Sequence, residues 1–440
     1  MNSPADIVTE VLKSVKQKGA TAAEVAYSEG AGISVSCRDD AVDTIENNHD
    51  KSLVVTVYKG QASGSASTAV VDQPSIELSI EKALSIAALT EADPYAGLAD
   101  VEELATEFKD LKTYFDNSSD SDQLIEQALE ASAAARDFAS AQGLSMAVDE
   151  SNVEVGTAAS IYANSNGFLG HKRGSNISAS VVAIGKNDGQ MERAYWWDAK
   201  RNAEHMLSAQ ELGRMAAEKT LERLGSRKLK SCQAPVVFDP SMAKSLISHM
   251  IQAISGSALY QEASFLKNDL QKSIFPNWFG VTEDPFVPSG FASRNYDGNG
   301  VRTQRRELID AGVLNGFLLS VYAARRLNMK TTGNAGGAHN LLVHSEQPLV
   351  DDLLNEMGTG LLVTSLMGQG FNAVTGDYSR GASGFWVENG EIQYPVSELT
   401  IAGNLRDMFL QLQALGSDVD QRSHIQTGSW LIDGMAIAGN

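Results

Sequence analysis

Alternation of apolar and polar residues is the main pattern in the first half of the chain. It predicts strands over residues 23–66 and again over 144–194. Turn residues at 30–32 and at 47–48 interrupt the first of these regions, so we expect them to separate the strands of an antiparallel meander. These patterns predict antiparallel sheets in the first half.

Apolar residues at helical spacing predict helices beside these strands. The first begins at Ser3 and Pro4, and others are expected over 75–90, 121–141 and from Ser208 to Gly225. The N-terminal region is therefore expected to be antiparallel sheets with flanking helices.

The second half is richer in strands and in glycine. A short apolar strand at 235–238 precedes an amphipathic helix over 241–255, and strands dominate from residue 256 onward. Asn389-Gly390 is typical of a tight hairpin turn between alternating strands. Because strands and helices are grouped rather than alternating, we predict an α+β fold rather than a doubly wound parallel sheet.

The length and composition favour a two-domain protein of a reducing compartment. A chain of 440 residues exceeds the size at which one core keeps growing. We divide it into an N-terminal α+β domain (1–225), a linker (226–234) that contains the basic run RKLK, and a β-rich C-terminal domain (235–440). Two cysteines do not make a disulfide framework and are typical of the cytoplasm.

Charge and hydropathy argue against nucleic-acid and membrane partners. The net charge is −20, from 55 acidic and 35 basic residues, so the chain should repel a phosphate backbone. No apolar run approaches the ~20 residues that a membrane span needs. The N-terminus also lacks the apolar core of a secretory signal.

Few residues point to a catalytic site by themselves. His249 is the single histidine of the 241–255 helix, and a lone imidazole does not hold catalytic zinc, which takes about three protein ligands. His339 and His344 have no metal-ligand spacing, and we expect them to pack in their loop. Walker, GxGxxG and GxSxG patterns are absent from the sequence, so we assign no catalytic and no metal residue.

Two polar clusters are candidates for a substrate path or an interface. Asp377 and Arg380 lie in a glycine-rich loop, where they could clamp a peptide terminus or a partner's loop. We favour a structural alternative, in which Asp377 accepts loop amides and pairs with Arg380. Arg302 belongs to the other cluster, VRTQRRE, in which alternation directs only one of Arg305 and Arg306 to a cleft. Our candidates are thus His249, Arg302, His339, Asp377 and Arg380.

Several sequence segments of the second half resemble the PmbA (TldE) branch of the TldD/PmbA family, bacterial metalloproteases also called modulators of DNA gyrase. The segments that carry the resemblance are TGDYSRGASGFWVENGEIQYPVSE, LTIAGNLRDM, GVRTQRRELIDAGVLNGFLLSVYAARRL and TTGNAGGAHN. The likeness is strong over 236–440 and looser but colinear before it.

The resemblance implies a cytoplasmic heteromeric peptidase that cleaves unfolded peptides. In the family, a TldD-type subunit carries HExxxH and binds zinc, with a cysteine ligand near the C-terminus. Here the corresponding helix reads SLISHMIQAISG, and Thr427 stands at the cysteine's position. The resemblance therefore implies that this chain shapes the chamber for a TldD-type partner. A non-enzymatic binding or regulatory homodimer and an independent hydrolase are the alternatives.

Overall fold

The computed structural model describes residues 3–38, 40–187 and 189–439, and it confirms the predicted α+β class. The first half contains one six-stranded antiparallel sheet in the order β3-β2-β1-β4-β5-β6. Its strands are β1 (Ala22–Arg38), β2 (Ala41–Lys59), β3 (Ala62–Thr68), β4 (Ser145–Asn164), β5 (Leu169–Asn187) and β6 (Gln190–Lys200). Its helices are α1 (Pro4–Gln17), α2 (Gln73–Leu89), α3 (Ser121–Ala141) and α4 (Ala209–Leu221).

The predicted turns at 30–32 and 47–48 are wrong, because both segments lie inside long paired strands. Gly32 of β1 stands opposite Asn48 of β2 on one side and Gly156 of β4 on the other. A Cβ at Gly32 would lie 2.9 Å from the carbonyl oxygen of Val155, so this glycine permits close strand packing. Alternation fails in β2 because residues 41–51 are exposed on both faces.

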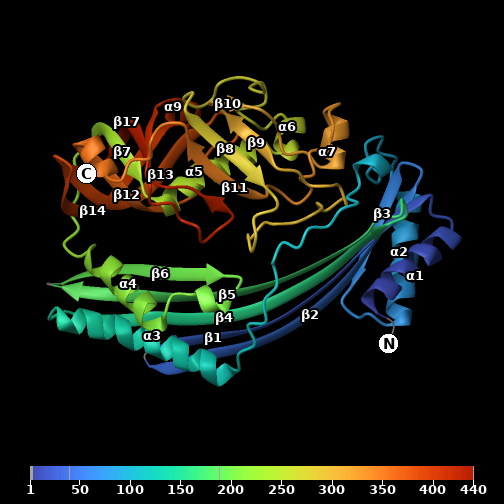
Figure 1. The fold of residues 1–440 in the computed structure, drawn as a ribbon, viewed down its shortest axis with the longest axis horizontal. Coiled ribbons are helices and arrows are strands. Elements are labelled where there is room, and N and C mark those ends of the chain that lie inside the picture. Colours follow the sequence, from blue (N-terminus) through green and yellow to red (C-terminus); the bar gives the residue numbers. More distant parts are fainter. Residues whose placement is uncertain (1–2, 39, 188, 440) are drawn as a thin grey trace.

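The helices of the first half pack near opposite ends of the long sheet (Figure 1). Apolar residues of α1 and α2 bury against β1 and β2, with Val8, Val25 and Val55 fully buried. Helices α3 and α4 cover β4 and β5 near the other end. The C-terminal domain lies above the sheet, on the side away from α3 and α4 (Figure 1).

The C-terminal domain contains two sheets, β10-β9-β8-β11-β16 and β14-β13-β12-β7-β17-β15. An additional pairing between β14 and β17 closes five strands of the second sheet into a ring. The strands are β7 (Cys232–Phe238), β8 (Phe279–Asp284), β9 (Arg306–Asp310), β10 (Val313–Leu314), β11 (Asn340–Ser345), β12 (Gly360–Met367), β13 (Asp377–Glu388), β14 (Glu391–Asn404), β15 (Leu412–Leu415), β16 (Ile425–Gln426) and β17 (Trp430–Ala438). The helices are α5 (Pro240–Ala253), α6 (Gly256–Tyr260), α7 (Val321–Arg326), α8 (Leu353–Met357) and α9 (Leu405–Leu410).

The first and last strands of this domain are neighbours. β7 pairs with β17, and the hydroxyl of Ser231 donates to the carbonyl of Gly439 at 2.9 Å. The predicted hairpin at Asn389 and Gly390 is confirmed, with φ of 54° and 80° at the two positions, between β13 and β14.

The segment predicted as a solvated linker lies against the C-terminal domain. Its last residues belong to β7, which begins at Cys232. The amide of Arg227 donates to the carbonyl of Pro395 at 2.9 Å, and its guanidinium lies 4.6 Å from the ring centre of Tyr394. The domain division itself stays a prediction.

Contacts at several places hold the domains together, among them a buried cluster that joins Phe168 to Tyr296. Asp420 accepts from Lys244 and from Arg422, whose guanidinium lies 4.4 and 4.8 Å from the rings of Trp196 and Trp197 on β6. The connection between α2 and α3 also lies along the C-terminal domain, where Ala105 donates to the carbonyl of Gly300. In the described part of the chain, no helix combines the length and apolar character of a membrane span.

Candidate functional site

Helix α5 carries His249 at the centre of the C-terminal domain. Asp239 caps the helix by accepting from the amide of Met242 at 2.9 Å. Leu246, Ile247 and Met250 are fully buried on its inner face. The helix is therefore fixed in the core, which gives His249 a defined position.

The His249 ring packs against residues that follow β12 and begin β13. Its centre lies 4.4 Å from that of Phe371 and 6.0 Å from that of Tyr378. Burial, together with the positive charge of Arg380, lowers the pKa of His249 to about 4. The imidazole is therefore neutral at physiological pH.

Three polar atoms around His249 are buried without a hydrogen-bond partner. They are Nε2 of His249, Oη of Tyr378 and Nε of Arg380. Buried polar atoms are usually hydrogen-bonded, and such groups collect at binding sites. Sequence reasoning singled out His249 and Arg380, and the structure brings them together, whereas Tyr378 was missed as a site residue.

The residues around His249 do not fit a catalytic zinc ion. An HExxxH motif that began at His249 would place its glutamate at 250 and its second histidine at 254, but Met250 and Ile254 are fully buried apolar residues. Thr427 is also buried, and its hydroxyl accepts from the indole of Trp430 at 2.8 Å. The charge of Arg380 beside the imidazole further disfavours a cation. The described residues hold no group of three His, Cys, Asp or Glu side chains suited to a metal.

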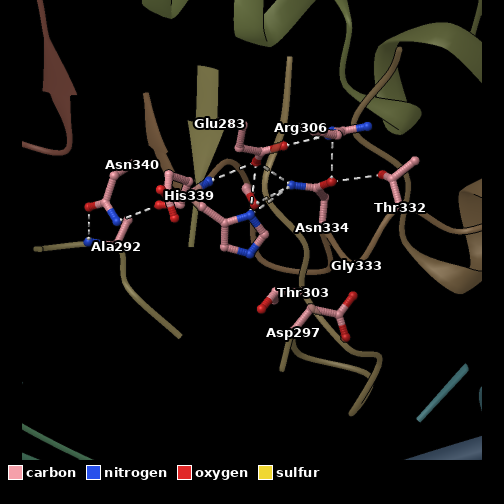
Figure 2. Close-up of polar contacts among 12 residues, drawn as sticks. Glu283, Ala292, Asp297, Thr303, Arg306, Thr332, Gly333, Asn334, His339 and Asn340 are labelled. Atoms are coloured by element: carbon pink, nitrogen blue, oxygen red, sulfur yellow. Dashed lines mark hydrogen bonds and ion pairs between the residues drawn. The ribbon is translucent and has the colours of Figure 1, made fainter. Parts of the chain in front are cut away.

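His339 lies in a different place, in a buried network around Glu283 of β8 (Figure 2). One carboxylate oxygen of Glu283 accepts from the amide and from Nδ1 of His339, both at 2.9 Å, and from Asn334 at 2.7 Å. The other oxygen accepts from Nε of Arg306 at 2.7 Å. Glu283 and His339 are each 1% exposed.

This network holds an ionised carboxylate, paired with Arg306, in the interior. Burial alone raises the pKa of Glu283, but the hydrogen bond from His339 and the charge of Arg306 outweigh it and bring the pKa to about 2. Because an ionised carboxylate only accepts, Nδ1 of His339 carries the proton. Arg306 also donates to the carbonyl of Phe317 at 3.1 Å and to Asn334 at 3.0 Å.

The Glu283 network supports one wall of a pocket beside α5. The side chain of Asn334 is hydrogen-bonded to both Glu283 and Arg306 (Figure 2). The residues after it, which include Gly336 and Gly337, form the glycine-rich loop. This loop and the outer face of α5 enclose a pocket of about 500 Å³. Its lining includes Ser248, Gln252, Ser255, Tyr260, Gly336 and Gly337. The lining also includes apolar side chains such as Ile251 and Leu318, and a neutral wall of mixed polarity made partly of main chain is suited to an extended peptide.

The remaining candidates lie outside these two clusters. Arg302 is exposed, and its guanidinium donates to the carbonyl of Glu102 in the inter-domain connection. The favoured ion pair between Asp377 and Arg380 is wrong, because residues three apart in a strand point to opposite faces. Asp377 instead accepts from Thr375 at 2.7 Å and from Asn404 at 3.2 Å.

The acidic centre of the Glu283 network was missed by sequence reasoning. The signal was present, since Glu283 follows the mostly apolar residues FGVT within one strand, where an unpaired charge would be costly. The sequence did not reveal the partners of Glu283, because Arg306 and His339 are 23 and 56 residues away from it along the chain.

Three sequence models of one peptidase family match this chain in succession. They are PmbA/TldA metallopeptidase domain 1 over 23–87, the central domain over 116–224 and the C-terminal domain over 231–439. The chain is similar to Metalloprotease PmbA of Escherichia coli, with 42% identity over 97% of this chain and 94% of the relative. A Metalloprotease PmbA homolog of Haemophilus influenzae is 40% identical over 99% of this chain and all of the relative.

Solved structures share the fold along its whole length. A candidate modulator of DNA gyrase from Bacteroides thetaiotaomicron matches with a TM-score of 0.92 and 27% identity, covering all of both chains. TldE from Thermococcus kodakarensis matches with a TM-score of 0.88 over 98% of this chain and all of that one; at 20% identity it supports the fold alone. From the matched models and relatives together, this chain belongs to the PmbA/TldA metallopeptidase family.

Proposed function

We propose that this chain is the metal-free subunit of a two-subunit cytoplasmic peptidase. A TldD-type partner supplies the zinc ion, and this chain forms part of the chamber in which unfolded peptides are cleaved. The observation that carries the proposal is the surroundings of His249: apolar core residues at 250 and 254 and an arginine beside the ring.

The contribution of this chain is the shape of the chamber. The pocket between α5 and the glycine-rich loop presents hydroxyl, amide and main-chain groups, which recognise a peptide backbone more than its sequence. The Glu283 network keeps the loop in place before a peptide arrives. We expect such a site to take extended chains, which favours unfolded peptides over folded proteins as substrates.

Reconstitution tests this proposal. The chain is purified alone and with a TldD-type subunit, bound zinc is measured by mass spectrometry, and cleavage of an unstructured peptide is followed. We expect no stoichiometric zinc in the lone chain and cleavage only in the mixture. The TldD-type subunit alone is the control, and His249→Ala in this chain should leave the zinc content of the mixture unchanged.

Three results would redirect the assignment. Stoichiometric zinc in the lone chain that is lost in His249→Ala would overturn it. A stable homodimer that associates with no TldD-type subunit would instead support a binding or regulatory protein. Cleavage by the lone chain without metal would indicate an independent hydrolase.

A further inference from the structure

A cavity of about 640 Å³ lies between the long sheet and the C-terminal domain, away from α5. Its walls come from β1, β4 and β5, from the connection at 109–114 and from the loop at 293–296. Six cationic side chains line it: Lys109, Lys112, Lys172, Arg173, Arg201 and Arg294. Only two carboxylates do so, Glu29 and Asp110. The chain as a whole has the opposite balance, 55 acidic against 35 basic residues.

Most of these cations have no carboxylate partner. Asp110 pairs with Lys112 at 2.5 Å, and Glu29 accepts from the hydroxyl of Tyr27 at 2.8 Å. Among the described residues, the other five cations make no ion pair within 4.0 Å. Positive charge in the cavity is therefore compensated only in part, through the more distant carboxylates of Asp297 and Glu283.

The cations rest on aromatic rings and main-chain carbonyls instead. Nζ of Lys172 lies 4.1 Å from the ring centre of Tyr296, and the guanidinium of Arg173 lies 3.3 Å from that of Tyr114. These contacts position the charges without neutralising them.

Arg201 is placed with its guanidinium only partly used. It donates to the carbonyls of Ser175 and Phe291, both at 2.9 Å, and to that of Gly290 at 3.3 Å, while its Nε atom is buried and has no hydrogen-bond partner. Gly174 makes room for it, because a Cβ there would lie 2.9 Å from Nη1 of Arg201. These carbonyls and Gly174 therefore fix the position of the guanidinium at the cavity wall.

Partial burial of three of these cations also favours the binding of an anion. Lys172, Arg201 and Arg294 are half-buried. Burial, with the nearby charge of Arg294, lowers the pKa of Lys172 to about 8, although Asp297 opposes this. Asp297 is itself occupied by the amides of Asn299, Val301 and Ala335. Cations removed from water in this way are costly unless an anion joins them.

We propose that this cavity binds an acidic stretch of a peptide, with its carboxylates against Lys172, Arg201 and Arg294. The inference rests on the proposed function, whose substrates are extended peptides, and adds a preference for acidic ones. The cations come from separate elements and surround a volume larger than a single small anion needs. Over the residues that the structure describes, no helix terminus lines the cavity, so the usual cradle for a phosphate group is missing there.

Peptide binding to the purified chain alone tests the proposal. Fluorescein-labelled hexaglutamate and hexaglutamine peptides are compared by fluorescence anisotropy at low salt, and competition with tripolyphosphate is measured. We expect the glutamate peptide to bind, the glutamine peptide not to bind, and the affinity to fall with added salt.

Charge-removing variants locate the site. Lys172→Gln and Arg294→Gln should each weaken binding of hexaglutamate on the order of tenfold, the effect of losing one charge-assisted contact. The matched control is Arg214→Gln on α4, an exposed arginine paired with Glu218 at 3.0 Å, which should change binding less than about twofold. Thermal unfolding checks each variant, and the exposed Lys109→Gln replaces either variant that does not fold.

Several outcomes would overturn the inference. It fails if the two peptides bind equally, or if the Arg214 variant loses as much affinity as the cavity variants. Binding of tripolyphosphate without hexaglutamate would assign the cavity to a phosphate compound instead. Because the assay needs neither partner nor cleavage, an inactive mixed complex would refute the proposed function and leave this inference standing.

Discussion

Replacement of Glu283 by glutamine tests whether the buried network supports the C-terminal domain. The side chain keeps its volume, but an acceptor-only carboxylate becomes an amide with one acceptor oxygen. Glu283 receives four hydrogen bonds, three at one oxygen and one from Arg306 at the other. Whichever way the amide turns, its NH₂ group meets a donor, so at least one buried donor loses its acceptor.

Two arguments give the same magnitude for this loss. The pKa of Glu283 falls from 4.5 to about 2 on folding, which corresponds to roughly 3 kcal/mol of stabilisation by the ionised form. Breaking a buried ion pair by removing one partner costs about 3–5 kcal/mol. Solvent screening is small, because Glu283 is 1% exposed and the Arg306 side chain is 17% exposed. We expect Glu283→Gln to lower the free energy of unfolding by about 3 kcal/mol.

Urea denaturation and hydrogen–deuterium exchange in β8 and β11 measure the effect. Glu307→Gln on the neighbouring strand is the control; its half-exposed side chain bonds Thr282 and His344, and it should cost less than about 0.5 kcal/mol. Because the folded pKa is depressed, the stabilisation is full above pH 4.5 and is lost as the pH falls toward 2. The difference in the free energy of unfolding between the wild-type protein and Glu283→Gln should therefore be smaller at about pH 3.5 than at neutral pH. If Glu283→Gln and Glu307→Gln had the same free energy of unfolding at neutral pH, the reasoning would be refuted.

Three further predictions concern the helices. Gly213→Ala should destabilise the N-terminal domain by about 1–3 kcal/mol in urea denaturation, since the new Cβ would lie 2.1 Å from the carbonyl oxygen of Ala131; an unchanged midpoint would contradict it. Asp239→Ala removes the cap of α5 and should cost about 1 kcal/mol, with faster amide exchange in the first turn of that helix alone. The His249 ring should titrate by NMR near pH 4, and a midpoint near 6.5 would show that the ring is not desolvated. Since its folded pKa is lowered, this histidine makes stability fall as the pH drops from about 6.5 toward 4.

The sequence was sufficient where the signals are local. Residues 121–141 form the predicted helix α3, because a capping box at Asp120 and Gln123 fixes its start. The hairpin at Asn389-Gly390 also follows from two residues alone. By contrast, the long strand β2 was not recognised as continuous, since its first half is exposed on both faces and loses the alternation on which prediction depends.

The candidate sites depend on contacts between distant segments, which spacing does not reveal. His249 and Arg380 were both singled out, yet only the fold places the arginine beside the imidazole. The basic cavity is less visible still, because Lys172, Arg201 and Arg294 come from three separate segments of an acidic chain. Charge counts over the whole sequence conceal such a local reversal.

The adjacency of β7 and β17 has a consequence for engineering the molecule. Since Ser231 and Gly439 are hydrogen-bonded to each other, a short loop would join the two ends of the C-terminal domain without moving either strand. New termini opened at the Asn389-Gly390 turn would then preserve every strand pairing in the ring. The order in which this domain's strands are synthesised is thus separable from the shape they adopt, and a circular permutant should retain that shape.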